Sequence, residues 1–276
     1  MVTLPPDPPA STEPAPHLHR QMAESFGVNA ERYDRTRQPY PADLITRVLA
    51  NAPGAEVLDV GCGTGIAARQ FRAAGATVLG VEPDARMAEF ARSTGIAVEP
   101  GTFEDWDPRD RQFDAIIAAT SWHWVDPVAG AAKARHLLRP NGRIALFWHI
   151  AQPPPSVNDA FTAACREVIP DQPIPNQPSR DIYRPILAKP AESLRAAGGF
   201  TAPEEWLFDW ERTYTREEWL DQVPTQGIFT RLDPQTLSRI LDPLGAAIDA
   251  LGGTFTMTYT TAAVTAVRDT TEPEQP

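Results

Sequence analysis

An α/β fold built around a mostly parallel sheet is the architecture that this sequence predicts. Short apolar segments alternate with helix-like segments along the first half of the chain, at 56–61, 76–82, 97–103, 113–121 and 143–150. Alternation of this kind is typical of parallel strands connected by crossover helices. A glycine-rich turn directly after the first apolar segment is the second observation, because such turns join a strand to a helix in folds of this class.

Two of the expected crossover helices carry clear end signals. The first begins after Asp84, a residue type that caps helix N-termini, and stops at Gly95. The second begins at Asp126 and Pro127 and stops at Pro140. Because crossovers between parallel strands are right-handed, these helices leave few topologies to consider.

The composition argues against a membrane or nucleic-acid partner. Of the 276 residues, 42% are hydrophobic and 22% are charged, and no apolar run approaches the length of a membrane span. The formal net charge of -11 would repel phosphate backbones, and no stripe of Lys and Arg offsets it. Residues 1–9 hold prolines and an acid where a secretion signal needs basic and apolar residues, so a cytoplasmic location is expected.

Polar tails are expected at both ends of the chain. Residues 1–20 contain six prolines and almost no large apolar side chains, which predicts a disordered tail, and 269–276 is a second polar tail. The folded domain is therefore expected to cover 21–268. The two cysteines do not form a metal-spaced pair, so the sequence predicts neither a metal site nor a disulfide.

The second half of the chain predicts an inserted lid followed by a strand pair. The segment 151–190 holds nine prolines around one amphipathic stretch, a pattern that interrupts the regular alternation. Strand patterns return at 205–214 and within 254–267, on either side of a helical pair that covers roughly 215–250. We expect 151–190 and parts of 215–250 to cover the ends of the strands. An antiparallel pairing of the last strands is compatible with these runs.

The glycine turn is the strongest functional signal. The apolar strand 57–60 runs into a loop with glycines at alternate positions. Glycine permits positive φ and close approach of the backbone to a ligand, and the following helix N-terminus offers free N–H groups to an anionic group. The spacing is G-x-G-x-G, whereas nicotinamide-binding folds usually show G-x-G-x-x-G. The residues that we assign to ligand binding here are Asp59, Gly61, Cys62, Gly63 and Gly65.

Acidic and aromatic residues follow the next two strands. Glu82 ends the second strand where folds of this kind place an acid that accepts hydrogen bonds from ribose hydroxyls, and Pro83 follows it. Glu82 is therefore a candidate for contacts with a ribose. The third strand leads into Thr102, Phe103 and Glu104.

The strand ends and turns together resemble a known family. The loop at 59–65, the segment 113–117 and the turn 138–142 are similar to class I S-adenosylmethionine (SAM)-dependent methyltransferases of the small-molecule type, the group that includes trans-aconitate methyltransferase. The likeness covers roughly 30–150. It implies a Rossmann-like sheet of seven strands with a reversed hairpin at its edge, SAM as methyl donor and S-adenosylhomocysteine (SAH) as product. The family commonly has an acid for the adenine amine where this chain has Thr102, followed by a backbone N–H for the ring, which Phe103 would supply. The resemblance therefore implies Thr102 as the partner of the amine, with Glu104 or Asp105 as alternatives.

The segment ahead of the glycine turn, 30–41, matches a part that similar enzymes fold over the cofactor. Tyr33 and Arg37 could then reach the methionine carboxylate or the substrate. An equally good interpretation is that the arginines of 30–41 are solvated and that Tyr40 packs at the start of the next helix.

The chemistry is expected at the ends of the fourth and fifth strands, because ligands of open α/β sheets bind outside the carboxyl ends of the strands. His123 is the first candidate for a base or for orienting the acceptor, and His149 is the second. Alignment of the reactants alone can also drive methyl transfer. Ala119 is expected beside the cofactor, and Trp122 and Trp124 are expected to contact the substrate or to fill the core.

Three other functions remain open on the sequence alone. A nicotinamide-dependent oxidoreductase would share the strand, the turn and Glu82, but not the glycine spacing. A SAM-binding regulatory or interaction module would bind the cofactor without turnover. A protein methyltransferase would need an open site, whereas a lid at 151–190 favours a small-molecule acceptor.

Overall fold

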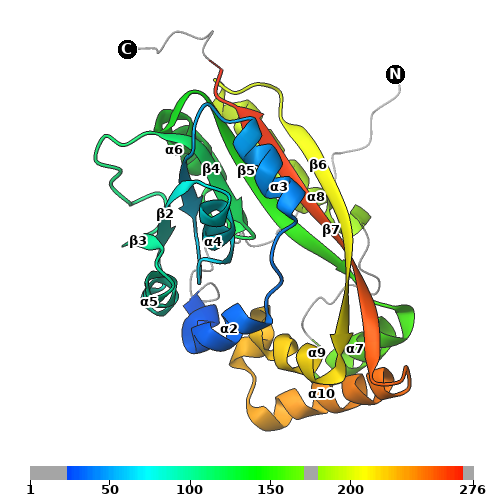
Figure 1. The fold of residues 1–276 in the computed structure, drawn as a ribbon. Helices are drawn as coiled ribbons and strands as arrows, with labels where there is room; N and C mark the ends of the chain where they lie inside the picture. The colour runs from blue at the N-terminus through cyan, green and yellow to red at the C-terminus, as the bar shows by residue number, and fades with distance from the viewer. Residues whose placement is uncertain (1–23, 171–179, 270–276) are drawn as a thin grey trace, which may run out of the picture.

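The computed structural model describes residues 24–170 and 180–269, and it contains a sheet of seven strands (Figure 1). The strand order is β3-β2-β1-β4-β5-β7-β6. The strands are β1 (Glu56–Val60), β2 (Thr77–Glu82), β3 (Ala97–Pro100), β4 (Phe113–Ala119), β5 (Leu138–Gln152), β6 (Glu204–Thr215) and β7 (Thr254–Val267). The expected α/β class with a mostly parallel sheet is confirmed. The predicted tail at 1–20, and all but the first residue of the one at 269–276, lie outside the described residues.

Only β7 runs opposite to the other strands of the sheet. Strands β1 to β5 pair in parallel, whereas β7 pairs antiparallel with both β5 and β6. This is the reversed edge that the family resemblance implied. Strand β5 begins at Leu138, five residues before the expected start, because the turn around Asn141 joins the strand through a register shift opposite Phe113 and Ala115.

Helices cover both faces of the sheet. On one face α3 (Ala42–Ala50), α4 (Ile66–Ala73) and α5 (Ala85–Ser93) bury residues such as Leu44 and Phe71 against the strands. On the other face α6 (Pro127–Leu137) and α8 (Arg180–Ala197) bury Leu137, Leu187 and Leu194. Burial of apolar side chains on both faces explains why the parallel strands are almost continuously hydrophobic.

A third group of helices lies beyond the carboxyl ends of the parallel strands (Figure 1). It comprises α2 (Ala30–Thr36), α7 (Pro155–Val168), α9 (Arg216–Gln222) and α10 (Pro234–Asp249), with the short 3-10 segments η2 (Glu24–Asn29), η4 (Val223–Thr225) and η5 (Gly227–Arg231) beside them. Helices α7, α9 and α10 share a separate apolar cluster with the ends of β6 and β7.

The segment expected to act as one lid, 151–190, is divided between two places. Its first part forms α7, which packs on α10 at the strand ends. Its last part belongs to α8, where Leu187 packs with α6 on a face of the sheet. The prediction that all of 151–190 covers the strand ends is therefore wrong for α8, and 171–179 lies outside the described residues. None of the helices in the described ranges has the length and apolar character needed to cross a bilayer.

Candidate functional site

A cavity of about 400 Å³ lies at the carboxyl ends of β1, β2 and β4. Thirteen of the residues predicted from the sequence line it: Tyr33, Arg37, Gly61, Cys62, Gly63, Glu82, Pro83, Thr102, Phe103, Glu104, Ala119, His123 and Trp124. Four predicted residues do not line it: Asp59, Gly65, Trp122 and His149. The parallel topology produces this convergence, because it brings the ends of strands that are distant in sequence to one edge of the sheet.

The glycine turn forms one wall of the cavity. Gly61 and Gly63 have φ values of 64° and 55°, a backbone region that side chains disfavour. A Cβ on Gly61 would also lie 2.7 Å from the Cβ of Ser121, so no larger residue fits there. Beside Gly63 there is open space. The turn therefore presents bare backbone to the cavity, and a ligand can approach it closely.

Gly65 has a structural task. It caps α4 with a φ of 86°, and a Cβ there would lie 3.3 Å from the Cβ of Ala91 and 3.4 Å from Ile96. The third glycine of the motif thus allows α4 to pack against α5 and its following turn. Gly65 does not line the cavity, and its contact with a cofactor stays a prediction.

Asp59 lies beneath the turn and is completely buried. Neither carboxylate oxygen has a hydrogen-bond partner among the described residues. Burial raises the pKa of Asp59 to about 7 from an ordinary 3.8, and the charge of Glu82 acts in the same direction, while the nearby amide of Ala68 opposes them. Asp59 does not line the cavity, and its contact with a ligand stays a prediction.

Replacement of Asp59 by asparagine is expected to flatten the pH dependence of folding stability. The folded-state pKa lies above the ordinary value, so stabilisation present at low pH is lost as the pH rises through about 7. Each pKa unit corresponds to roughly 1.4 kcal/mol, so the loss amounts to a few kcal/mol. Urea unfolding of both proteins at pH 5 and pH 8 measures it. If the unfolding free energy changes equally between pH 5 and pH 8 in both proteins, Asp59 is not the group responsible.

Glu82 is held in place by the backbone around it. Its Oε2 accepts a hydrogen bond from the amide of Gly63 at 2.8 Å, and its Oε1 accepts one from the amide of Asp84 at 2.9 Å. Burial raises the pKa of Glu82 to about 7, although both amide hydrogen bonds lower it. Each oxygen keeps a free lone pair, so the carboxylate can still accept hydrogen bonds from a ligand in the cavity.

The turn after β3 contributes the next part of the wall. The hydroxyl of Thr102 donates to Asp105 Oδ2 at 2.8 Å, and Glu104 Oε1 accepts from the amide of Asp126 at 2.7 Å. Phe103 is only 3% exposed and packs on Trp122 with ring centroids 5.9 Å apart. Thr102 and Glu104 thus hold neighbouring backbone as well as lining the cavity, while Phe103 offers an apolar surface.

Helix α2 and the residues after it cover another side of the cavity. The guanidinium of Arg37 lies 4.5 Å from the ring centroid of Tyr33, and its Nη2 donates to the carbonyl of Thr225 at 2.6 Å. Its Nε is buried and has no partner among the described residues. Arg37 therefore keeps a free donor at the cavity. Gln226 and Gly227 line the same side.

His123 lies in the short 3-10 segment η3 (Trp122–Trp124) at the cavity wall. The indole Nε1 of Trp148 donates to His123 Nδ1 at 3.3 Å, which leaves Nε2 to carry the ring proton. Burial lowers the pKa of His123 to about 4. The imidazole is therefore neutral at pH 7. Trp124 lines the cavity beside it, with ring centroids 4.7 Å apart.

Trp122 and His149 are displaced from the site. Trp122 is 2% exposed and packs in the core against Phe103, so the alternative of a core role holds for it. His149 stacks on Tyr40 at 4.4 Å, and its Nδ1 lies 2.9 Å from the hydroxyl of Thr261. Burial lowers the pKa of His149 to about 3. His149 does not line the cavity, whereas Tyr40, on which it stacks, does, and the catalytic role of His149 stays a prediction.

Tyr40 and Thr120 also line the cavity. The sequence did not assign these two residues to the site. The hydroxyls of Tyr40 and Thr120 lie 3.0 Å apart. Gln70 clamps Tyr40 from behind, since its side-chain amide bonds both the N–H and the carbonyl of Tyr40 at 2.8 and 2.7 Å. Thr120 has a φ of 58°, which is strained for a β-branched residue and is common at functional sites. The position of Thr120 directly after a buried strand is the sequence feature that could have indicated its place at the site.

Comparisons with known proteins give one consistent family. A family model described as a methyltransferase domain matches residues 33–251. An uncharacterized methyltransferase from Mycobacterium tuberculosis is 35% identical over 132 residues, which is 47% of this chain and 54% of the relative. A malonyl-[acyl-carrier protein] O-methyltransferase from Pseudescherichia vulneris is 30% identical over 149 residues, which is 52% of this chain and 59% of the relative. The matched part spans little more than half the length of these curated relatives.

Solved structures share the fold. A protein from Anaeromyxobacter dehalogenans, solved as a candidate type II methyltransferase, aligns with a TM-score of 0.62 at 21% identity and covers 84% of this chain and 98% of that one. The likeness to class I methyltransferases drawn from the sequence is confirmed, while the narrower likeness to trans-aconitate methyltransferase stays a prediction. Because the family model covers most of its length, the chain belongs to the methyltransferase-domain family.

Proposed function

We propose that this chain binds SAM in the cavity and transfers the methyl group to a small-molecule acceptor. The observation that carries the proposal is the buried carboxylate of Glu82, fixed by two backbone amides directly beside the bare glycine backbone of 61–63. A fixed acceptor pair next to a glycine turn suits a ribose with two neighbouring hydroxyls. A cavity of about 400 Å³ lies within the usual range for sites of ligands of this size.

The remaining walls fit the other parts of SAM. Met87 and Phe103 offer an apolar surface to an adenine ring, and the polar groups of Thr102 and Glu104 lie at its edge. Arg37 keeps a buried, free Nε–H, which suits the methionine carboxylate. A phosphoethanolamine N-methyltransferase 2 from Haemonchus contortus, solved with SAH, shares the fold with a TM-score of 0.50 at 14% identity, which is compatible with this choice.

The protein contributes alignment and exclusion of water more than proton transfer. SAM supplies an electrophilic methyl group on a sulfonium that is already a good leaving group. Tyr40, Thr120 and His123 can each hydrogen-bond an acceptor at the cavity wall, and Trp124 can pack against it. With a pKa of about 4, His123 is a weak base, so we assign it to orienting the acceptor through Nε2–H.

The segments that cover the cavity are proposed to select the acceptor. Gln226 and Gly227 come from the predicted cover at 215–250 and line the cavity. Helix α7 does not line it and acts by supporting α10. This arrangement favours a small acceptor over a protein side chain, which would need an open approach.

Isothermal calorimetry with SAH tests the cofactor, and we expect micromolar binding. NAD⁺ serves as the matched alternative, and tighter binding of NAD⁺ than of SAH would overturn the proposal. Transfer of labelled methyl from SAM to a panel of small carboxylic acids, phenols and amines then tests the activity. Binding of SAH without turnover on any acceptor would favour the regulatory module, and labelling of protein in a cell extract alone would favour a protein methyltransferase.

A further inference from the structure

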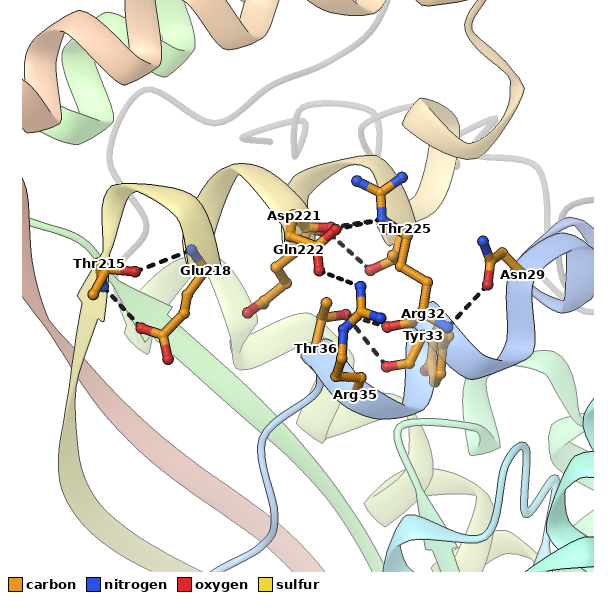
Figure 2. Close-up of polar contacts among 10 residues, drawn as sticks. All are labelled: Asn29, Arg32, Tyr33, Arg35, Thr36, Thr215, Glu218, Asp221, Gln222 and Thr225. Atoms are coloured by element: carbon orange, nitrogen blue, oxygen red, sulfur yellow. Dashed lines mark hydrogen bonds and ion pairs between the residues drawn. The ribbon is translucent and has the colours of Figure 1, made fainter.

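One carboxylate fastens helix α2 to helix α9 (Figure 2). Asp221 Oδ1 lies 2.8 Å from Nε of Arg32, and Asp221 Oδ2 lies 2.6 Å from Nη2 of Arg35. The same Nε of Arg32 also donates to the backbone carbonyl of Asp221 at 3.1 Å. Figure 2 shows both arginines reaching from α2 toward this one residue.

The geometry of α2 connects this contact to the cavity. Arg32 and Arg35 are three residues apart and point toward α9, whereas Tyr33 and Arg37 are four residues apart and line the cavity. Any rotation or lifting of α2 that breaks the contact with Asp221 therefore also moves Tyr33 and Arg37.

Helix α2 is also attached on the opposite side. Asp34 forms an ion pair with Arg69 of α4 at 2.6 Å, so α2 spans from the glycine-turn half of the domain to α9. Next to the Asp221 contact, Arg37 donates to the carbonyl of Thr225, and Gln38 Nε2 donates to Gln222 Oε1 at 3.1 Å. The helix thus forms a strap across the cavity with one anchored side at α4 and another at α9.

In the contact between α2 and α9, the single carboxylate of Asp221 faces two arginines. Partial burial by itself would raise the pKa of Asp221, but the hydrogen bond from Arg35 and the charge of Arg32 lower it overall. About a third of the Asp221 side chain stays exposed, so salt can screen the contact. An isolated surface ion pair contributes little to stability. Because the carboxylate of Asp221 holds two arginines of one helix, it affects the position of that helix more than the stability of the fold.

We propose that Asp221 is a positioning residue of the cofactor site, which holds α2 across the cavity so that Arg37 and Tyr33 reach the methionine end of the ligand. The proposal rests on the proposed function for the identity of that ligand. Loss of the Asp221 charge loosens one side of the strap, although the hydrogen bonds to the backbone carbonyls of Asp221 and Thr225 and to Gln222 remain. The ligand then loses contacts at its carboxylate end and leaves the cavity faster, while contacts to its adenosine end persist.

The test compares Asp221→Asn with Asp249→Asn as a matched control. Asp249 is the last residue of α10 and forms a similar ion pair at 3.2 Å, with Arg216 of α9 instead of with α2. The two probes are SAH and 5′-methylthioadenosine, which has the same nucleoside and lacks the amino-acid carboxylate. We expect Asp221→Asn to weaken SAH by about 10-fold and to speed its release similarly, the scale of one charge-assisted hydrogen bond. Affinity for 5′-methylthioadenosine should change by less than about 2-fold.

Rescue and salt dependence separate positioning from general stability. Asp221→Glu keeps the charge and should restore most of the SAH affinity. Raising the salt concentration should speed SAH release more in the wild type than in Asp221→Asn, because only the wild type has the ion pairs of Asp221 to screen, while the Asp34–Arg69 pair is common to both. Equal weakening of both probes, or an unchanged release rate of SAH from Asp221→Asn, would overturn the proposal.

Amide hydrogen exchange keeps the inference separate from the proposed function. In the ligand-free protein, residues 30–37 should exchange faster in Asp221→Asn than in Asp249→Asn, because α2 opens more often. If the wild type fails to bind SAH, the proposed function fails while this measurement still tests the strap. If exchange in 30–37 is equal in the two variants, Asp221 does not hold α2 and the inference is wrong.

Discussion

Glu82→Ala is expected to weaken SAH binding by roughly 1 to 3 kcal/mol, which is about 5- to 150-fold. The charged carboxylate lines the cavity and is fixed by the amides of Gly63 and Asp84, so it can accept ribose hydrogen bonds without reorganising. Calorimetry with SAH measures the loss. Glu99→Ala is the matched control, because Glu99 pairs with Arg111 at 2.7 Å and does not line the cavity.

The same carboxylate is expected to make SAH binding depend on pH. Burial raises the pKa of Glu82 to about 7, and only the charged form accepts hydrogen bonds with both oxygens. Affinity should therefore be higher at pH 8.5 than at pH 6, with the loss occurring as the pH falls through about 7. Asp59 titrates in the same range and is coupled to Glu82, so the two act as a pair. If SAH affinity keeps the same pH dependence in Glu82→Ala, a group other than Glu82 causes it.

His123→Ala is expected to lower methyl transfer by roughly 10²-fold once an acceptor is found, with little change in SAH affinity. The loss reflects a misplaced acceptor, because the neutral ring offers Nε2–H at the cavity wall. The low pKa, about 4, adds a further expectation. Turnover should show no ionisation of His123 between pH 6 and pH 9, and protonation should appear only as the pH falls toward 4.

Nitrogen NMR of the His123 ring measures its protonation state and does not require that the methyl acceptor be known. At pH 7 the spectrum should show a neutral ring protonated at Nε2. Trp148→Phe removes the donor to Nδ1 and should allow the other tautomer to appear. A pH-rate profile with an inflection near 6.5 that disappears in His123→Ala would instead support a general base.

The parts of the site that lie along one short stretch of chain were predictable from local pattern. Gly61, Gly63 and Glu82 follow directly from buried strands, and a parallel sheet places the carboxyl ends of such strands at one edge. The helix after Asp84 begins as its capping signal predicts, with the side chain accepting from the amide of Arg86. Each of these features depends on neighbours within a few residues.

Contacts between distant segments were decided by the tertiary structure alone. His149 lies within β5, which continues to Gln152, and Trp122 lies in η3 after the end of β4. Their packing against Tyr40 and Phe103 leaves both off the cavity wall. Tyr40 and Thr120 are 80 residues apart, and their hydroxyls meet only when 30–41 folds over the sheet.

The sequence by itself determined the α/β class, the glycine turn and the acid at the end of β2, because strand periodicity, backbone freedom at glycine and helix capping are local properties. The tertiary structure decided which polar groups reach the cavity and which are buried beneath it. It also decided that Asp221 holds α2, since Arg32 and Asp221 are 189 residues apart and no local pattern pairs them. Side-chain burial and the distances across the cavity depend on how whole helices pack, and this packing sets the pKa of Asp59 and of His123.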